Sequence, residues 1–314
     1  MITVIGEVLV DLVVSPDWSC RATPGGAPAN VAVALARLGQ DVSLKARISR
    51  DGFGGMLRHH LAGNGVSPRD LVTAEEPTTL AIATLGAGGQ AAYSFYLKET
   101  ADWMWQPSEV TPLAADVTAL YLGSLAMALP PGSARIESFA ERARATGQIV
   151  VFYDPNVRPS ATPDARAERA RVERQLRLAH VAKASAEDIG WLYPGEPVSE
   201  VARRWQRLGP DLVVVTLGSE GAYGLGRNGT ELTAPAVPAD VRDTIGAGDA
   251  FSAGLLDAMG EEDLLGPGGI AGLPRLSPSQ LGRLLTSAGI VAALTCERSG
   301  ADPPRKAEVI ERRA

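Results

Sequence analysis

A glycine-rich segment just before a helical run carries the residues best suited to chemistry. It reads DTIGAGD at residues 243–249, and apolar residues follow at helical spacing over 250–256. Small residues let backbone N–H groups at a helix start approach an anion closely, and the helix dipole favours negative charge there. Asp249 adds a first-turn carboxylate that can accept a proton. Together these features suit phosphoryl transfer to a hydroxyl, although Asp249 alone could equally be a favourable helix-start residue.

Two other glycine-rich segments imitate a dinucleotide-binding motif. Residues 86–91 read GAGGQA and lie between two expected strands, and residues 224–229 read GLGRNG and precede an extended stretch. The dinucleotide motif seats a pyrophosphate on a helix N-terminus, which neither segment supplies. We therefore expect turns there and disfavour a dehydrogenase. No lysine follows a glycine and precedes Ser or Thr, so the sequence also lacks a P-loop.

Composition and charge narrow the functional classes further. The 314 residues are 45% hydrophobic, and 30 basic against 36 acidic residues give a net charge of −6. This acidic balance argues against binding to nucleic acid or to an anionic membrane. Two cysteines and three histidines are too few for a disulfide framework or for a thiolate or histidine metal site. The N-terminal stretch lacks the features of a signal peptide, so we expect a cytoplasmic protein.

The chain alternates between β-like and helical stretches. Short runs rich in Val, Ile and Leu occur at residues 2–5, 42–46, 119–122, 149–153, 180–182 and 212–217. Helical spacing is clear at 30–38 and 53–62, and we expect a helix after each later strand. The Arg-rich run at 166–177 predicts a solvated helix face, and the Gly/Pro-rich run at 266–272 predicts a surface loop. This alternation predicts a mainly parallel sheet with helices on both faces.

One region breaks the alternation. Residues 80–85 and 91–97 are β-like and are joined by only a short Gly-rich stretch, which predicts a hairpin. Residues 8–14 are also β-like and could join this hairpin in a small separate sheet. The scarce aromatic residues gather here and just after, as Tyr93, Phe95, Tyr96, Trp103 and Trp105. They predict a small hydrophobic core, a cover over a substrate, or both, since the two are compatible.

Four motifs resemble those of the ribokinase-like (PfkB) carbohydrate kinases, in the family's order along the chain. GGAPAN at 25–30 resembles the N-terminal glycine signature, and DTIGAGD at 243–249 resembles the C-terminal signature. VTLGSEG at 215–221 is similar to the nucleotide-site strand and turn. CERSGA at 296–301 is similar to the segment near the nucleotide and monovalent-cation sites. The resemblance therefore covers nearly the whole chain.

Further features resemble the fructokinase branch of that family. Gly6 and Glu7 with Asp11 stand where ribokinases have an Asn before the Asp. DPNVRP at 154–159 resembles the strand-end motif of fructokinases and 2-keto-3-deoxygluconate kinases. KASAED at 183–188 resembles a fructokinase stretch that precedes WLYPG, here at 191–195, and ADW at 101–103 also looks fructokinase-like.

This resemblance implies a fold and a reaction. The fold is a ribokinase-like three-layer α/β/α domain with a mainly parallel sheet, plus a small β-sheet lid. The large domain is expected at 1–9, 24–76 and 103–314, and the lid at 10–23 and 77–102. The reaction is ATP-dependent phosphorylation of a sugar hydroxyl, with fructose giving fructose 6-phosphate as the leading choice. The alternatives are a 2-keto-3-deoxygluconate kinase or another PfkB sugar kinase, and a catalytically inactive sugar- or nucleotide-binding protein of the same fold.

The resemblance also assigns residues to the sugar and the transferred phosphate. Asp249 is expected as the base, and Gly246, Ala247 and Gly248 as the anion hole. The residues expected around the sugar are Asp11, Gly25, Gly26, Asn30, Phe95, Lys98, Asp154 and Asn156. Arg158 is a fork-shaped donor suited to the transferred phosphate or to a substrate carboxylate.

The remaining assignments concern ATP and cations. The residues expected at the ATP site are Lys183, Ser185, Thr216, Gly218, Ser219, Gly221, Gly246 and Gly248. Asp243, Ile245 and Gly300 are expected around a monovalent cation, potassium first. Many family members carry an Asn-x-x-Glu motif near Mg²⁺, whereas this sequence has Ser185 and Asp188 there, which leaves Asp188 as the candidate Mg²⁺ ligand. Mg²⁺ is expected with ATP. We also expect small-molecule partners only, and a homodimer paired through the lid.

Overall fold

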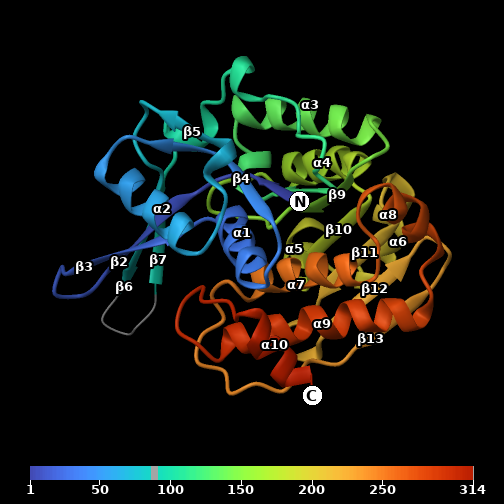
Figure 1. The fold of residues 1–314 in the computed structure, drawn as a ribbon. Coiled ribbons are helices and arrows are strands. Elements are labelled where there is room, and N and C mark those ends of the chain that lie inside the picture. Colours follow the sequence, from blue (N-terminus) through green and yellow to red (C-terminus); the bar gives the residue numbers. More distant parts are fainter. Residues whose placement is uncertain (86–90, 314) are drawn as a thin grey trace.

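A nine-stranded sheet forms the centre of the structure, a computed structural model that describes residues 1–85 and 91–313 (Figure 1). From edge to edge its strands are β13 (Glu231–Ala234), β12 (Ala222–Gly226), β11 (Leu212–Thr216), β10 (Val181–Ser185), β9 (Val150–Asp154), β8 (Ala119–Gly123), β1 (Ile2–Ile5), β4 (Val42–Ser49) and β5 (Leu71–Ala74). The pairs β11–β12 and β12–β13 are antiparallel, and the other pairs are parallel. This is the mainly parallel sheet that the sequence predicts.

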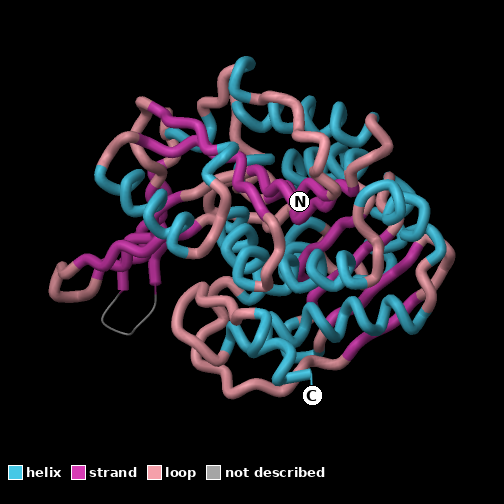
Figure 2. The backbone as a smooth tube through the Cα atoms, in the orientation of Figure 1, coloured by secondary structure: helices cyan, strands magenta, loops and turns pink. Residues whose placement is uncertain are grey.

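Helices cover both faces of this sheet, as Figure 2 shows. The core on one face takes side chains from α1 (Ala27–Arg37), α2 (Gly52–Gly63), α7 (Ala247–Glu261), α8 (Gly266–Gly272), α9 (Pro278–Cys296) and α10 (Lys306–Arg313). The core on the other face takes side chains from α3 (Gly132–Ala145), α4 (Ala165–Gln175), α5 (Ala186–Leu192) and α6 (Val198–Leu208). Strand β1 contributes Ile2 and Val4 to the first core and Ile5 to the second. A strand buried on both faces explains the continuous hydrophobic runs in the sequence.

A second, four-stranded sheet lies beside the large one and is called the small sheet below. Its order is β3 (Cys20–Gly25), β2 (Leu9–Val14), β6 (Leu80–Leu85) and β7 (Ala91–Tyr96). The antiparallel β6–β7 pair confirms the predicted hairpin, and β2 runs parallel to β6. The turn predicted at 86–91 falls on residues 86–90, which lie outside the described residues.

Hydrogen bonds tie the chain segments that connect the two sheets. Asp102 Oδ1 accepts a 2.9 Å bond from the N–H of Val8, and the hydroxyls of Thr79 and Thr100 are 2.6 Å apart. All four residues are buried. Segments far apart in the sequence are therefore joined at the base of the small sheet.

Two element predictions are wrong. Residues 266–272 form helix α8 rather than a surface loop, and Gly269 lies against the Leu264 carbonyl, where a side chain has no room. Strand β11 is followed by the hairpin β12–β13 rather than by a helix. Gly221 makes the turn between β11 and β12. Its φ is 101°, and the carbonyl oxygen of Ala234 lies where a Cβ would be. Strands β3 and β5 were not predicted from the sequence.

Side chains in two other regions are more deeply buried than their sequence suggests. Trp103 and Trp105 are 3% and 1% exposed and belong to the core beneath α3, which agrees with the predicted small hydrophobic core. On α4, for which a solvated helix face was expected, Glu168 and Arg171 are buried as an ion pair. Because one face of α4 packs against the large domain, only its other face meets solvent.

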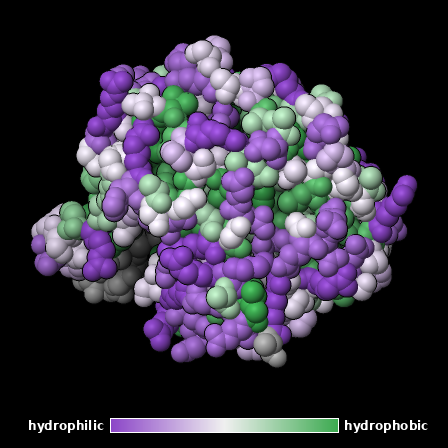
Figure 3. Space-filling view, viewed as in Figure 1, coloured by the Kyte–Doolittle hydropathy of each residue, from purple (hydrophilic) through white to green (hydrophobic). Residues whose placement is uncertain are grey.

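The surface gives no sign of a membrane span. Within residues 1–85 and 91–313, no helix combines the length and apolar character that crossing a bilayer requires. Hydrophilic residues dominate the view of α9 and α10 in Figure 3.

Candidate active site

The carboxyl ends of the parallel strands meet at a point where the order of the sheet reverses. Strand β1 pairs with β4 on one side and with β8 on the other, so the following connections leave in opposite directions. In open α/β sheets, ligands bind outside the carboxyl ends of the strands at such a point. Glu7, just after β1, spans it, because its Oε2 accepts a 3.0 Å bond from the N–H of Ala126 after β8.

The predicted anion-binding turn lies at the start of α7. Gly246 is the N-cap residue and has φ 76°, a left-handed conformation that suits glycine. A side chain there would also meet Ala301, 2.7 Å from the Cβ position. The N–H groups of Gly248 and Asp249 have no acceptor in the described part of the chain. This 15-residue helix therefore presents free donors to an anion.

Asp249 lies in that first turn and is 8% exposed. Asn30, in the first turn of α1, donates a 2.8 Å hydrogen bond from Nδ2 to Asp249 Oδ2. Burial raises the pKa of Asp249 to about 6, while the Asn30 hydrogen bond and the charges of Lys183 and Arg158 oppose the rise. At neutral pH the carboxylate is therefore mostly ionised and can accept a proton.

Asp154 and Lys183 form a buried ion pair on the floor of the site. Asp154 ends β9 and is fully buried, and Lys183 on β10 is 4% exposed. Their Oδ2 and Nζ atoms are 2.9 Å apart. Burial alone would lower the pKa of Lys183, but the Asp154 carboxylate raises it above its usual value. Lys183 therefore remains charged.

Asp11, Gly25 and Gly26 form one side of the site at the base of the small sheet. Burial raises the pKa of Asp11 to about 6, against the opposing charge of Arg158. The Asp11 carboxylate occupies the space where a Gly25 side chain would lie. Gly26 has φ 102° and its Cβ position is 2.7 Å from the Glu7 carbonyl. These glycines let two backbone segments and a carboxylate pack closely together.

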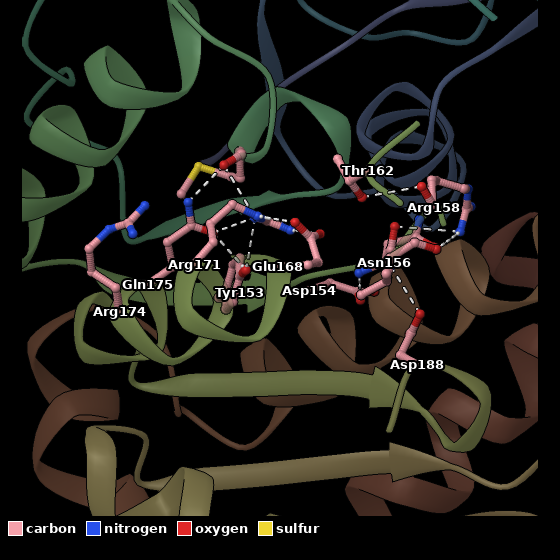
Figure 4. Close-up of polar contacts among 12 residues, drawn as sticks. Tyr153, Asp154, Asn156, Arg158, Thr162, Glu168, Arg171, Arg174, Gln175 and Asp188 are labelled. Carbon is pink, nitrogen blue, oxygen red and sulfur yellow. Dashed lines mark hydrogen bonds and ion pairs between the residues drawn. The ribbon is translucent and has the colours of Figure 1, made fainter. Parts of the chain in front are cut away.

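The segment after β9 carries Asn156 and Arg158 (Figure 4). Asn156 has φ 39°, and its N–H lies 3.2 Å from Asp154 Oδ1. One guanidinium nitrogen of Arg158 donates to the carbonyl of Val157 at 3.1 Å. The charge of Arg158 acts on Glu7, Asp11 and Asp249 alike. The structure therefore brings Arg158 together with the predicted base and the predicted sugar ligand.

Ser185 and Asp188 form a capping box at the start of α5. Ser185 Oγ accepts a 3.0 Å bond from the N–H of Asp188, and Asp188 Oδ2 accepts one of 3.0 Å from the N–H of Ser185. Asp188 Oδ1 accepts a further 3.0 Å bond from the N–H of Val157 (Figure 4). Burial raises the pKa of Asp188, and so does its neighbour Asp154. The Asp188 carboxylate thus holds the segment that follows β9 in place.

The predicted nucleotide residues lie beside Ser185. Thr216 ends β11 and is the direct partner of Ser185 across the β10–β11 pair. The turn that follows is a 3₁₀ helix, Gly218–Glu220, whose three residues are exposed. These residues and the free N–H groups of α7 offer donors suited to the phosphates of a nucleotide and an exposed turn suited to its nucleobase.

The residues predicted around a monovalent cation also come together. The Asp243 carboxylate accepts a 3.0 Å bond from the N–H of Ile245 and a 2.8 Å bond from the N–H of Gly300. No cluster of three or more acidic, His or Cys side chains that could hold a metal occurs in residues 1–85 and 91–313.

Two further predicted residues, Phe95 and Lys98, belong to β7 and to the stretch after it: Phe95 pairs with Ala81, which pairs with Asp11, so these three residues lie in one row across the small sheet. Phe95 on β7 packs partly buried against the core that contains Trp103, and Lys98 is exposed. Two buried hydroxyls near the site were not predicted, those of Ser252 on α7 and Tyr121 on β8. Ser252 Oγ lies 3.1 Å from Asp154 Oδ2. The helical spacing of Ser252 from Gly248 is the only sequence signal that could have indicated it.

Comparison with known proteins gives matches over nearly the whole chain. Residues 1–307 match the pfkB family carbohydrate kinase family. Fructokinase of Klebsiella pneumoniae is 35% identical over 298 residues, which cover 93% of this chain and 95% of the relative. Fructokinase from Xylella fastidiosa, solved with bound ATP, is 26% identical with a TM-score of 0.88, covering 99% of this chain and 97% of that chain.

A second solved structure was determined with a sugar, a nucleotide and a cation bound. It is fructokinase from Vibrio cholerae O395 with fructose, ADP and calcium ion bound, 26% identical with a TM-score of 0.83, covering 99% of this chain and 97% of that chain. A double mutant of that enzyme was solved with fructose, ADP and potassium ion. With matches that extend over nearly its whole length, this chain belongs to the PfkB family of carbohydrate kinases and is close to the family's fructokinases.

Proposed function

We propose that this sugar kinase transfers the γ-phosphate of ATP to the 6-hydroxyl of fructose, with Asp249 as the base. The observation that carries the proposal is the position of Asp249. Its buried carboxylate accepts a hydrogen bond from Asn30 and belongs to the same helical turn as the free N–H groups of α7. A proton acceptor and an anion cradle in one turn are what phosphoryl transfer to an alcohol requires.

The proposed reaction is a single displacement at the γ-phosphorus. Asp249 takes the proton of the sugar hydroxyl as the oxygen bonds to phosphorus. The bond between the γ-phosphorus and the bridging oxygen breaks, and ADP leaves with that oxygen. The N–H groups of Gly248 and Asp249 and the guanidinium of Arg158 stabilise the charge on the moving phosphoryl group. The products are fructose 6-phosphate and ADP.

The charges at the sugar side support a neutral sugar. Asp11, Glu7 and Asp249 are acidic groups near Arg158, and Arg158 lowers the pKa of each against the effect of burial. A substrate carboxylate, as in 2-keto-3-deoxygluconate, would add a further negative charge beside these groups. The acidic surroundings therefore favour fructose over the ketoacid.

ATP and cations belong to the same proposal. Thr216, Gly218, Ser219 and Gly221 would bind the nucleotide at the edge beside Ser185. Mg²⁺ would enter with the ATP phosphates, near Asp188, and would neutralise part of their charge. Potassium would lie at the junction of Asp243, Ile245 and Gly300. The bonds that Asp243 makes to Ile245 and Gly300 support this position because they already hold the two backbone segments together.

A coupled assay of ADP release across a panel of sugars tests the proposed function. Fructose is expected to give the highest kcat/KM, above 2-keto-3-deoxygluconate, ribose and glucose. A clear preference for the ketoacid would overturn the fructose assignment in favour of the main alternative. Absence of turnover with every sugar, together with measurable binding of ATP, would instead indicate a catalytically inactive binding protein.

We further propose a homodimer formed through the small sheet, and a cytoplasmic location. The small sheet ends in two edge strands, β3 and β7, whose unpaired backbone groups a second copy could cover. Trp18 in the turn before β3 and Tyr96 at the end of β7 are 80% and 60% exposed, which supports burial in a partner. Sedimentation of wild-type protein against a Trp18→Ser variant tests this assembly.

A further inference from the structure

A buried lysine below the anion-binding turn is paired with a buried carboxylate. The Nζ atom of Lys183 is 2.9 Å from Asp154 Oδ2, and this pair joins β10 to β9. With 4% exposure, the lysine lies beneath the surface of the site. Its position raises the question of what the ammonium contributes from there.

Ser252 continues this contact into α7. Its Oγ is 3.1 Å from Asp154 Oδ2 and 3.1 Å from the carbonyl oxygen of Gly248. Ser252 is fully buried, so no surface water competes for these contacts. A chain of polar contacts thus runs from Lys183 through Asp154 and Ser252 to the first turn of α7.

Gly248 shows that the ammonium is fitted closely to that turn. Unlike Gly246, Gly248 does not have a positive φ, so its backbone does not require a glycine. A Cβ placed on Gly248 would lie 3.3 Å from Lys183 Nζ, which is tight for a side chain beside a charged group. The glycine at this position therefore makes room for the lysine beneath the helix.

We propose that Lys183 is a positioning residue, which acts through Asp154 and Ser252 to fix the first turn of α7 so that its free N–H groups and Asp249 face one reaction centre. The inference rests on the proposed function because it assumes phosphoryl transfer at that turn. It differs from the ATP contact that the family resemblance implies for Lys183. A ligand of ATP would mainly change the KM for ATP, whereas a positioning residue changes kcat.

The electrostatics of the site agree with this role. The charge of Lys183 lowers the pKa of Asp249, whereas burial and Asp154 raise it. Asp188 also lies within the influence of Lys183. One ammonium thus offsets three neighbouring carboxyl groups, and its loss would raise the pKa of the base.

Variants of the chain of contacts test the proposal, using whichever sugar the panel shows to be turned over fastest. Lys183→Met is expected to lower kcat at least tenfold with the KM for ATP within threefold of wild type. The acidic limb of its pH–kcat/KM profile should move to higher pH. Ser252→Ala should change kcat in the same direction by less. The double variant should be no worse than Lys183→Met alone, because both residues act through Asp154.

Lys306→Met is a matched control, because Lys306 on α10 pairs at 2.8 Å with the buried Asp257, which lies about two helical turns beyond Asp249 on α7. It should lower the thermal stability but leave kcat and the acidic limb unchanged. If Lys183→Met fails to fold, the double variant Lys183→Met/Asp154→Asn replaces it. This variant leaves no unpaired buried charge, because Asp154 is neutralised as well. The paired variant should bind ADP yet keep the low kcat.

Two results would overturn the proposal. One is a raised KM for ATP with unchanged kcat in Lys183→Met, which would make the lysine a plain phosphate ligand. The other is strict additivity of the Lys183 and Ser252 effects. If the wild-type protein turns over no sugar, the proposed function fails separately. In that case, thermal unfolding of Lys183→Met, Ser252→Ala and their double variant still tests the chain of contacts. Residues that act through Asp154 should give non-additive losses of stability.

Discussion

Asn30 and Asp249 are hydrogen-bonded at 2.8 Å although 219 residues separate them. Asn30 lies in the first turn of α1 and Asp249 in the first turn of α7, and these helices pack on the same face of the sheet. The bond fixes the orientation of the buried carboxylate and stabilises its charged form. It also joins the N-terminal starts of two helices that are distant in the sequence at the proposed reaction centre.

Replacement of Asp249 by Asn should abolish most of the turnover. The change keeps the volume of the side chain but removes the proton acceptor, so kcat should fall by about 10²–10⁴-fold. Fructose binding, measured by calorimetry, should stay within a few-fold of wild type. Asp257→Asn on the same helix is the control and should remain active. Turnover by Asp249→Asn within a few-fold of wild type would show that another group accepts the proton.

Loss of the Asn30 side chain should shift the pH dependence. The hydrogen bond favours the ionised carboxylate, so Asn30→Ala should raise the pKa of Asp249 above its value of about 6. A base with a higher pKa is protonated over a wider range, so the acidic limb of the pH–kcat/KM profile should move to higher pH. Asn30→Asp, which adds a like charge, should move it further. Asn64→Ala, at the end of α2, should leave the limb in place, and an unmoved limb in Asn30→Ala would contradict the assigned contact.

Gly25→Ala should weaken sugar binding. A methyl group at Gly25 would collide with the carboxylate of Asp11, which is expected to hold sugar hydroxyls. We expect the KM for fructose to rise about tenfold, which corresponds to about 1.4 kcal/mol, with the KM for ATP unchanged. Gly55→Ala is the control because nothing lies within 4 Å of its Cβ position. If both variants bind fructose equally well, Asp11 does not contact the sugar.

We expect the buried ion pair of α4, Arg171 with Glu168, to stabilise the fold more than the exposed pair that Arg174 makes. Arg171 pairs with Glu168 and donates to Gln175 Oε1 at 2.6 Å (Figure 4). Arg171→Met leaves the buried Glu168 unpaired and should cost about 3–5 kcal/mol of unfolding free energy. Arg174→Met breaks the pair to Glu137, but Arg174 is 58% exposed, so about 0–1 kcal/mol is expected. Urea unfolding compares the two, and equal losses would show that burial of Arg171 contributes nothing.

Asp102 should make the stability fall as pH rises. Burial raises the pKa of Asp102 to about 7 in the folded chain, although the bonds from Thr79 and Val8 oppose the rise. Between the unfolded pKa near 4 and pH 7, the folded state therefore binds more protons than the unfolded state. Stability from this group is present at low pH and is lost as pH rises to about 7.

Asp102→Asn removes that titration, and its amide oxygen can still accept the N–H of Val8. The unfolding free energy of this variant should fall less between pH 5 and pH 8 than that of the wild type. Asp41→Asn, at an exposed position, should keep the wild-type pH dependence. Identical curves for Asp102→Asn and wild type would mean that Asp102 is ionised in the folded chain over this range.

The sequence was sufficient for the main elements of the fold. Continuous hydrophobic runs predict strands that are buried on both faces, and β1, β4, β8, β9, β10 and β11 lie where those runs are. Helix α8 was missed because its glycines have low helix propensity, and packing against Leu264 overrides that preference. Strand β3 was missed because Pro24 and Gly25 resemble a turn, yet they pair with β2 at the edge of the small sheet.

The sequence by itself determined which chemical groups are available: a helix start without side-chain bulk, an aspartate in its first turn, and polar residues after hydrophobic strands. Only the tertiary structure decided which of these groups meet. Parallel strands bring their carboxyl ends to one edge, so Asp154 meets Lys183 there and Thr216 pairs with Ser185. Helix packing then brings Asn30 to Asp249. The buried contacts of Ser252 and Arg171 left almost no trace in the sequence, because a polar residue on a helix looks the same whether it faces solvent or the core.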